Sequence, residues 1–135
     1  MTKTDKRFMR VAKSISKTSS YKRIKIGAVA VNKKHIISVG VNEPKSHPIQ
    51  KRYNVDYVEY GKDDHLKHGI HAEIACIVNA KHDLHGATMY IFREDNNGDL
   101  NICRPCEACY NMIKDVGISK IIYTIPNGYA VEKVV

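Results

Sequence analysis

The residues that could do chemistry gather in two short stretches, a His-Ala-Glu and, further along, a Pro-Cys-Glu-Ala-Cys. Zinc prefers imidazole and thiolate ligands, and a catalytic zinc uses three protein ligands and keeps its fourth position for water. His71, Cys106 and Cys109 supply three such ligands, and Glu73 is left free to carry protons. We therefore predict a catalytic site with Zn²⁺ as the cofactor, these three residues as its ligands, and Glu73 as the acid and base.

The elements that must hold these ligands are two predicted helices. A helix that begins at Pro105 would bring Cys106 and Cys109, three residues apart, to one face within its first turn. The unpaired N–H groups and the dipole at a helix start favour thiolate over thiol. His71 stands at the start of its own predicted helix, about 71–82, so two helix starts would point at one ion.

A fourth protein ligand would close the site and make the zinc structural. Cys103 is the candidate, but the proline that follows it should turn its side chain away from the cysteine pair. His65 and His68 are spaced by three from each other and from His71, which suggests a site with three histidines. They precede the predicted helix and Gly69 breaks the register, so we interpret them as loop residues.

Length and composition are those of an ordinary globular protein. With 135 residues, 43% hydrophobic and 27% charged, we expect a single domain over 1–135 with its own core. The first ten residues lack the apolar segment of a secretory signal, and no stretch is apolar enough to cross a bilayer. We expect a cytoplasmic protein without a membrane partner, whose thiols are reduced and available to a metal.

The net charge of +8 is concentrated at one end of the chain. Residues 1–25 hold nine Lys or Arg against the single Asp5, a balance of +8, whereas residues 26–135 hold thirteen of each sign and balance to zero. Such a basic segment attracts phosphates, which makes nucleic acid a possible partner. The alternative is an ordinary solvated helix face.

The pattern of apolar residues predicts the order α-β-β-α-β-α-β-β. The predicted helices cover residues 4–17 (with Thr4 as the N-cap), 71–82 and 105–117, and the predicted strands cover 24–31, 35–41, 87–93, 118–125 and 129–134, the last following a turn at Pro126-Asn127-Gly128. Strands alternating with helices predict an α/β protein of three layers, α/β/α, with a five-stranded sheet.

The connection over residues 43–70 has no clean periodicity and carries Pro44, Pro48 and Gly61. A connection this long inside a compact domain is usually functional. We expect a partly ordered insertion near the site, with a short helical turn and several tyrosines.

The sequence resembles the cytidine and deoxycytidylate deaminase superfamily, which includes tRNA adenosine deaminases and nucleic-acid cytidine deaminases. The resemblance covers most of residues 8–125 and rests on Ile26-Gly27-Ala28-Val29, Gly40-x-Asn42, His71-Ala72-Glu73, Gly86-Ala87-Thr88-Met89-Tyr90, Pro105-Cys106-x-x-Cys109 and Gly117-Ile118-x-Lys120. It implies a cytidine-deaminase-like fold with a mixed sheet. It also implies that Asn42 contacts the sugar, that the Ala72 backbone holds the base edge, and that Tyr123 flanks the base, although a role as a sheet aromatic is equally open for Tyr123.

The sequence departs from the pattern of this family in three places. Arg104 stands where Ser or Glu often precedes the Pro-Cys, and the Gly-Tyr-Asn-Gly loop linked to nucleotide regulation is Gly40-Val41-Asn42-Glu43 here. A terminal hairpin also replaces the crossover helix of the nucleotide branch. Lys22, Arg23 and Arg104 are candidate phosphate contacts, each with solvated surface as its alternative.

Together these features predict a zinc-dependent hydrolase that deaminates a small cytosine nucleotide, dCMP in the first instance. Two alternatives stay open: a cytidine or adenosine deaminase acting on single-stranded DNA or RNA, and a non-catalytic zinc-binding module. A five-stranded sheet is about 24 Å wide, whereas a helix is about 10–12 Å across. The first helix therefore cannot cover its face of the sheet, and we expect the long connection or a second subunit of a homo-oligomer to cover the rest.

Overall fold

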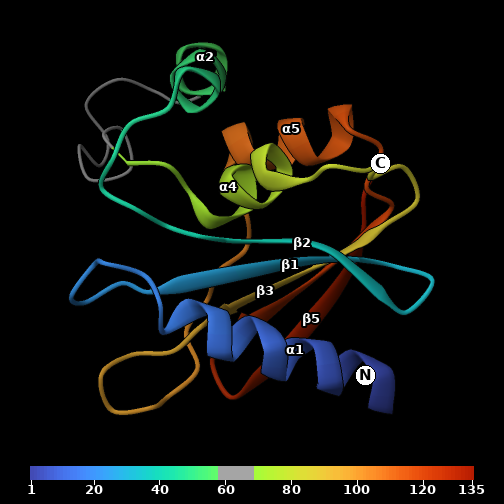
Figure 1. Cartoon of the computed structure of the whole chain (residues 1–135). Helices are drawn as coiled ribbons and strands as arrows, with labels where there is room; N and C mark the ends of the chain where they lie inside the picture. The colour runs from blue at the N-terminus through green and yellow to red at the C-terminus, as the bar shows by residue number, and fades with distance from the viewer. Residues whose placement is uncertain (58–68) are drawn as a thin grey trace.

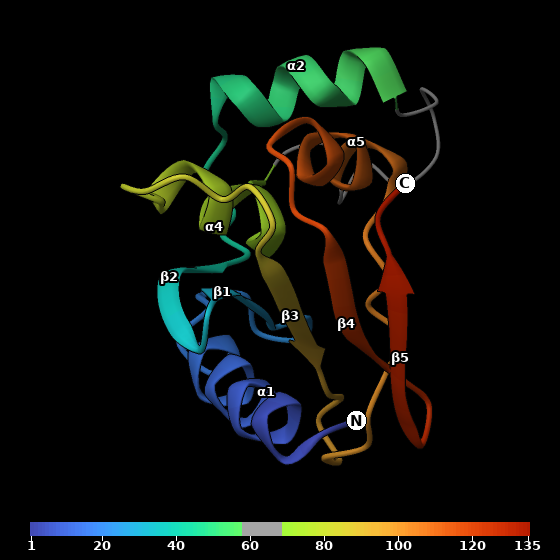
Figure 2. The same cartoon turned by 90° about the vertical axis from the view of Figure 1, so that its right-hand side faces the viewer.

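A computed structural model describes residues 1–57 and 69–135. Its centre is one five-stranded sheet in the order β2-β1-β3-β4-β5 (Figures 1 and 2). The strands are β1 (Ile26–Asn32), β2 (His35–Val41), β3 (Thr88–Arg93), β4 (Lys120–Ile125) and β5 (Gly128–Lys133). Only the β3–β4 pair is parallel and the other three pairs are antiparallel, so the predicted mixed sheet is confirmed.

Helices cover both faces of the sheet, as the three-layer prediction requires. On one face lies α1 (Lys3–Ser16), and on the other lie α4 (Ala72–Asn79) and α5 (Glu107–Asp115) (Figure 1). A further helix, α2 (Pro48–Tyr57), packs on the outer side of α5. β3 is central in the sheet, and its four middle residues are buried, which explains the unbroken apolar run.

The start of α1 is fixed by a capping box. The side chain of Thr2 accepts a hydrogen bond from Asp5 N, and the Asp5 carboxylate accepts one from Thr2 N. The predicted N-cap, Thr4, is wrong by two residues because Asp5 provides the reciprocal partner for Thr2. The carboxylate of Asp5 also accepts a hydrogen bond from the buried Tyr90 hydroxyl at 2.7 Å, which ties α1 to β3.

Two hairpins at the edges of the sheet have tight turns with positive φ angles. The β1–β2 turn is Lys33-Lys34, with φ of 49° and 65°, the pair of left-handed residues that a type I′ turn needs. In the terminal hairpin Ile125 pairs with Gly128, so Pro126-Asn127 forms the turn and Asn127 has φ 66°. The predicted hairpin is confirmed with its turn within Pro126-Asn127-Gly128, and Pro126 supplies the fixed φ of the first turn position.

Two glycines let helices approach the sheet closely. A Cβ atom on Gly27 of β1 would lie 2.3 Å from the Ala12 carbonyl oxygen of α1. A Cβ atom on Gly40 of β2 would lie 2.2 Å from Cys76 N and 2.6 Å from the Ala72 carbonyl oxygen of α4. Both glycines belong to the motifs that carry the family resemblance, and their physical role is to set the height of α1 and α4 above the sheet.

The 43–70 connection is closed at its base by an antiparallel bridge. Glu43 N donates to the Ile70 carbonyl at 3.1 Å, and Ile70 N donates to the Glu43 carbonyl at 3.0 Å. The expected short helical turn is the ten-residue α2, which begins with Pro48 at its first position. Tyr60, His65 and His68 lie outside the described residues.

The boundaries of the two site helices differ from the prediction. Helix α4 ends at Asn79, and all six residues from Ala72 to Ile77 are buried, so the helix has no exposed face until its last turn. Val78, which we expected to pack inward, is 37% exposed there. Helix α5 begins at Glu107 rather than at Pro105, because Cys106 has the extended backbone of an N-cap.

The cover over the α1 face of the sheet is incomplete at β5. Helix α1 packs chiefly against β1 and β3, and the described part of the 43–70 connection lies on the opposite face. Tyr129 and Val131 of β5 pair with Thr124 and Ile122 and share their face of the sheet, where they are 38% and 54% exposed. Within the described residues, no helix has the length and hydropathy to span a membrane.

Candidate metal centre and active site

The predicted metal ligands stand at the starts of two helices. His71 is the N-cap of α4 and Cys106 is the N-cap of α5, and neither side chain caps its own helix with a hydrogen bond. An N-cap side chain ordinarily accepts a bond from the first turn of its helix. Here both side chains turn instead toward a common point, which Cys109 also reaches from the first turn of α5.

The three donor atoms form a compact triangle. The Nδ1 atom of His71 lies 3.1 Å from Cys109 Sγ and 3.5 Å from Cys106 Sγ, and all three donor atoms lie within 4.8 Å of one another. Adjacent nitrogen and sulfur ligands of a tetrahedral zinc are about 3.6 Å apart, given the usual bond lengths. The predicted triad is thus brought together at a spacing that fits the ion.

Cys103 does not join this triangle. Its thiol lies within hydrogen-bond distance of the Ile91 carbonyl, at 3.3 Å, and of the Thr124 hydroxyl, at 3.0 Å. Burial raises the pKa of Cys103 to about 12, so it stays a protonated thiol. Among the described residues the donor cluster is His71, Cys106 and Cys109, a set of three rather than a closed set of four.

The two cysteine ligands differ in their affinity for protons. The hydrogen bond from Cys109, together with the nearby His71, lowers the pKa of Cys106 to about 4. Burial raises the pKa of Cys109 well above its usual value. Zinc binds cysteine as thiolate, so loading the site with the ion would release any proton that either thiol holds.

Glu73 lies on the second residue of α4, beside the triangle but outside it. Its side chain is buried, with 5% of its surface exposed, and burial raises the pKa of its carboxyl group. A carboxyl group with a raised pKa can hold a proton at neutral pH and donate it during a reaction.

A cavity of 200 Å³ opens beside Glu73, where β1 begins and β3 ends. Ligands of α/β proteins commonly bind beyond the carboxyl ends of the parallel strands. The lining residues are Tyr21, Ile24, Ile26, Asn42, Ile70, His71, Glu73, Arg93, Ile102, Cys103, Arg104 and Cys106. Among the described residues Glu73 is the single carboxylate in this lining, which also holds two arginines, Arg93 and Arg104.

The two arginines are held differently. Arg104 makes a bidentate ion pair with Glu132 of β5, at 2.8 and 3.0 Å. Arg93 donates one long hydrogen bond, 3.5 Å, to the Ile102 carbonyl, and no carboxylate among the described residues lies within ion-pair distance of it. Our sequence analysis missed Arg93; its position directly after the buried run of β3 was the available signal. Lys22 and Arg23 are exposed and do not line the cavity.

The three predicted substrate contacts have different surroundings. Asn42 lines the cavity, and its side-chain amide accepts from Ile26 N at 2.9 Å and donates to the Ile24 carbonyl at 2.7 Å. Ala72 is fully buried. Tyr123 packs in the core between the sheet and helices α4 and α5, and its hydroxyl donates to Glu132. All three contacts stay predictions.

Gln50 of α2 is a second residue that sequence analysis missed. It is 1% exposed, its side-chain oxygen accepts a hydrogen bond from His71 N at 2.9 Å, and its side-chain nitrogen donates to Asn54. The amide thereby fixes the backbone of the histidine from a helix outside the main layers. Glutamine in a segment without periodicity gives no local sign of this role.

The fold and the site define a class of protein: an α/β/α hydrolase with a three-ligand zinc centre and a buried acid. Comparison with known proteins then gives its family. The chain belongs to the cytidine and deoxycytidylate deaminase family, because the model of that family's zinc-binding region matches residues 2–125. It is therefore a zinc-dependent hydrolytic deaminase.

Individual relatives agree with this assignment. The deoxycytidylate deaminase of Mycobacterium phage D29 is 28% identical over 128 residues, which cover 88% of this chain and 92% of that protein. The dCMP deaminase of cyanophage S-TIM5 has a similar fold, with a TM-score of 0.64 at 21% identity over 91% of this chain and 84% of that one. Cytidine deaminase from Burkholderia pseudomallei gives a TM-score of 0.65 at 16% identity, over 99% and 94% of the two chains.

Replacing Gln50 with Ala should destabilise the metal centre. The partly buried His71 N–H would lose its acceptor, which costs about 1–3 kcal/mol of unfolding free energy, and zinc should be lost to a chelator more readily. Urea unfolding and zinc retention against EDTA measure the two effects. Lys51→Ala, at the exposed neighbouring position, is the control; equal behaviour of the two variants would contradict the role given to Gln50.

Proposed function

We propose that this protein deaminates a cytosine nucleotide and that its substrate is dCMP, which it converts to dUMP with release of ammonia. The observation that carries this proposal is the pair of arginines, Arg93 and Arg104, in the lining of the cavity that contains Glu73. Two guanidinium groups beside one buried carboxyl group favour an anionic substrate over a neutral nucleoside. The names of the phage relatives, deoxycytidylate and dCMP deaminase, point to the same substrate.

Glu73 is the group that we propose to move protons. His71, Cys106 and Cys109 would hold zinc, which would supply a nucleophile at neutral pH by lowering the pKa of water to about 7. The ring nitrogen of cytosine must gain a proton as water adds to C4, and the amino group must gain one to leave as ammonia. A single buried carboxyl group beside the metal ligands can deliver both protons, and burial helps it to hold them.

Arg93 is the proposed contact for the 5′-phosphate. It borders the cavity, and among the described residues it has no carboxylate partner to compete with a phosphate. Arg104 is less free, because Glu132 accepts two hydrogen bonds from it. A planar guanidinium binds phosphate with two parallel hydrogen bonds, which suits the single phosphate of a mononucleotide.

A polynucleotide substrate is less well supported. That alternative relied on the basic first helix to bind the strand and on tyrosines of the 43–70 connection to stack bases. Helix α1 lies on the face of the sheet opposite to α4 and α5, so its cations do not border the cavity (Figure 1). Tyr53 of α2 donates its hydroxyl to Asp115 of α5 instead.

We also propose that the protein works in the cytoplasm as a homo-oligomer. All four cysteines are free, which suits a reducing compartment. Tyr129 and Val131 leave an apolar strip on β5 that neither α1 nor α2 covers. A second copy of the chain is the proposed cover for the Val131 end of this strip.

The proposed reaction is tested by ammonia release from dCMP, CMP, deoxycytidine, cytidine and a cytosine-containing oligonucleotide. We expect dCMP to have the highest kcat/KM, and Glu73→Ala to lower kcat by roughly a hundredfold to ten-thousandfold. Zinc content should stay near one per chain in that variant. Turnover of the oligonucleotide alone would exclude dCMP as the substrate, and no turnover by a folded, zinc-loaded protein would favour the non-catalytic module.

Substitution of Arg93 by Met should separate phosphate binding from chemistry. Loss of a charge-assisted hydrogen bond should raise the KM for dCMP by about tenfold or more, whereas kcat/KM for deoxycytidine should not change. Arg23→Met is a matched control, because that arginine is exposed and lies outside the cavity lining. An increase in KM for Arg23→Met alone would move the phosphate contact to the 22–23 segment.

The oligomer is tested by light scattering at micromolar concentration. We expect a mass of at least two chains, and Val131→Lys should shift the protein toward a monomer because it places a charge in the apolar strip. A strictly monomeric wild-type protein would contradict the proposal.

A further inference from the structure

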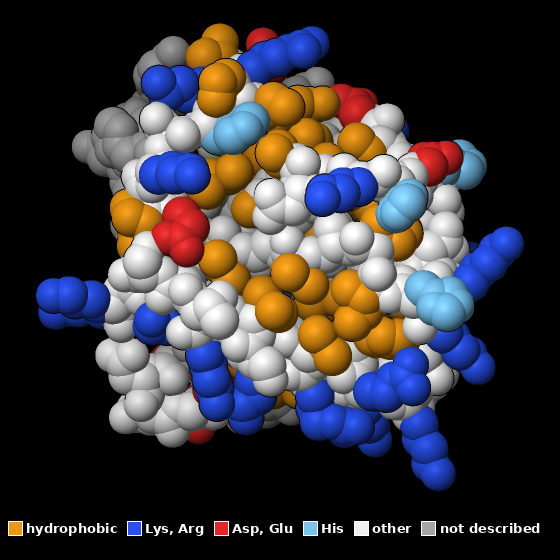
Figure 3. Space-filling model, viewed as in Figure 1, with side chains coloured by type: hydrophobic (Ala, Val, Ile, Leu, Met, Phe, Trp, Pro, Cys, Tyr) orange, Lys and Arg blue, Asp and Glu red, His pale blue; other side chains and the backbone are white. Residues whose placement is uncertain are grey.

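The exposed side of α1 carries cations and no carboxylate. Asp5, the one acidic residue of this helix, is buried and accepts hydrogen bonds from Tyr90 and from Thr2 N. Figure 3 shows Lys and Arg side chains gathered along the lower part of the molecule, over α1. The cations of this basic row are Lys3, Lys6, Arg7, Arg10, Lys13 and Lys17.

The basic row is regular and almost unpaired. Five of its members, from Lys3 to Lys17, recur every three or four residues, and Arg7 lies next to Lys6. They follow a helix of 14 residues and its C-cap, a helix about 21 Å long. Among the described residues only Lys13 has an ion pair, with Glu94 at 3.9 Å, and this pair is partly exposed. An exposed pair of this kind stabilises little. The row therefore presents a line of charge that is complementary to a chain of phosphates.

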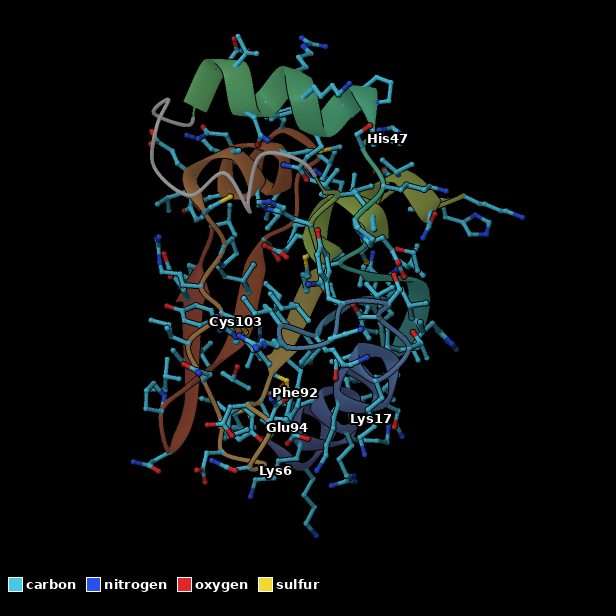
Figure 4. The ribbon with its side chains drawn as sticks, turned by 90° about the vertical axis from the view of Figure 1, so that its left-hand side faces the viewer. Lys6, Lys17, His47, Phe92, Glu94 and Cys103 are labelled. Carbon is cyan, nitrogen blue, oxygen red and sulfur yellow. The ribbon has the colours of Figure 1, made fainter. Side chains whose placement is uncertain are left out.

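A second cavity, of 330 Å³, lies beside the row between α1, the end of β3 and β5. Its apolar surface includes Met9, Phe92, Leu100 and Tyr129. Its charged rim holds three cations, Lys6, Arg10 and Lys13, and one carboxylate, Glu94, which pairs with Lys13. Figure 4 shows Lys6, Phe92 and Glu94 at the same lower end of the molecule, well away from His47 at the start of α2. An apolar hollow with an aromatic wall beside a row of cations suits an unstacked base whose backbone follows the row.

We propose that the basic row and this cavity form a binding site for single-stranded nucleic acid, separate from the catalytic centre. The sheet lies between the two, because α1 covers one face and the helices that carry His71 and Cys106 cover the other. A strand bound along α1 is thus a ligand and not the substrate. The inference does not depend on which nucleotide the enzyme deaminates.

The test measures fluorescence anisotropy of a labelled oligothymidylate of about 15 nucleotides with the zinc-loaded, full-length protein. Thymine has no amino group for the enzyme to remove. Lys6→Glu combined with Arg10→Glu should weaken binding by about tenfold or more, because these cations border the cavity. The matched control is Lys51→Glu combined with Arg52→Glu, which reverses one exposed lysine and one arginine on α2 at the opposite side of the molecule. It should change binding by less than about twofold.

Four further measurements decide whether the site is the proposed one. The logarithm of the binding constant should fall with the logarithm of the salt concentration, with a slope of about −0.7 for each phosphate contacted. This slope should be smaller in magnitude for the α1 double variant. Tyr129→Ser should weaken binding about fivefold or more if a base enters the cavity. A duplex of the same length should bind less tightly than the single strand. The α1 double variant should keep the wild-type kcat/KM for deamination.

Several results would overturn the proposal. Equal losses in the α1 variant and the α2 control would mean that only net charge matters. Equal affinity for a duplex, or displacement of the strand by dTMP at equal phosphate concentration, would mean that the site binds phosphate or a mononucleotide rather than a single strand. Displacement of the strand by dCMP together with unchanged binding by the α1 variant would place the strand at the catalytic cavity.

Discussion

The placing of a proposed zinc ligand at each of two helix starts is the constraint on which the rest of the structure depends. His71 and Cys106 lie in different parts of the chain, yet His71 Nδ1 lies 3.5 Å from Cys106 Sγ, so α4 and α5 must be fixed relative to each other within a fraction of a helix turn. Gly40 sets the height of α4 above β2, and Gln50 holds the backbone of His71. On the other side, Tyr53 of α2 bonds to Asp115 of α5. Helix α2 thus joins the two helices that carry the ligands, although it lies outside the three layers.

The sequence predicted the elements whose signals are local. The apolar periods of α1 and the β-branched runs of the strands lie in adjacent residues, and the ligand spacing within Pro-Cys-x-x-Cys needs one turn of helix. What it did not predict depends on contacts between distant residues. Arg93 borders the cavity only because β1 and β3 are neighbours, and Gln50 reaches His71 across 21 residues. Val78 fits the apolar period of its helix and was expected to pack inward, but the sheet does not cover that position. Helix α2 lacks a clear apolar face because it packs mainly on one helix, α5.

The sheet divides the molecule into two electrostatic environments. In the cavity on the α4 and α5 side, Arg104 bonds to Glu132, and Glu73 is buried beside the thiols. On the α1 side, cations are exposed along a helix whose one acid is buried. This separation explains how a chain with a net charge of +8 can keep a catalytic cavity in which the acid Glu73 is desolvated rather than surrounded by lysines. It also means that changes to α1 can alter the affinity for polyanions without altering the chemistry.

The bridge between Glu43 and Ile70 makes the chain between them a module. Two backbone hydrogen bonds hold both ends of this segment together, and Ile70 is followed directly by His71, the N-cap of α4. The entropy of closing a loop grows only slowly with its length once the ends are joined. Residues could thus be inserted or removed between the two ends without shifting the metal ligands, provided that Gln50 keeps its bond to His71. Proteins with this arrangement can differ in the whole segment between the two ends, and so in the residues that approach the cavity, while the zinc centre stays the same.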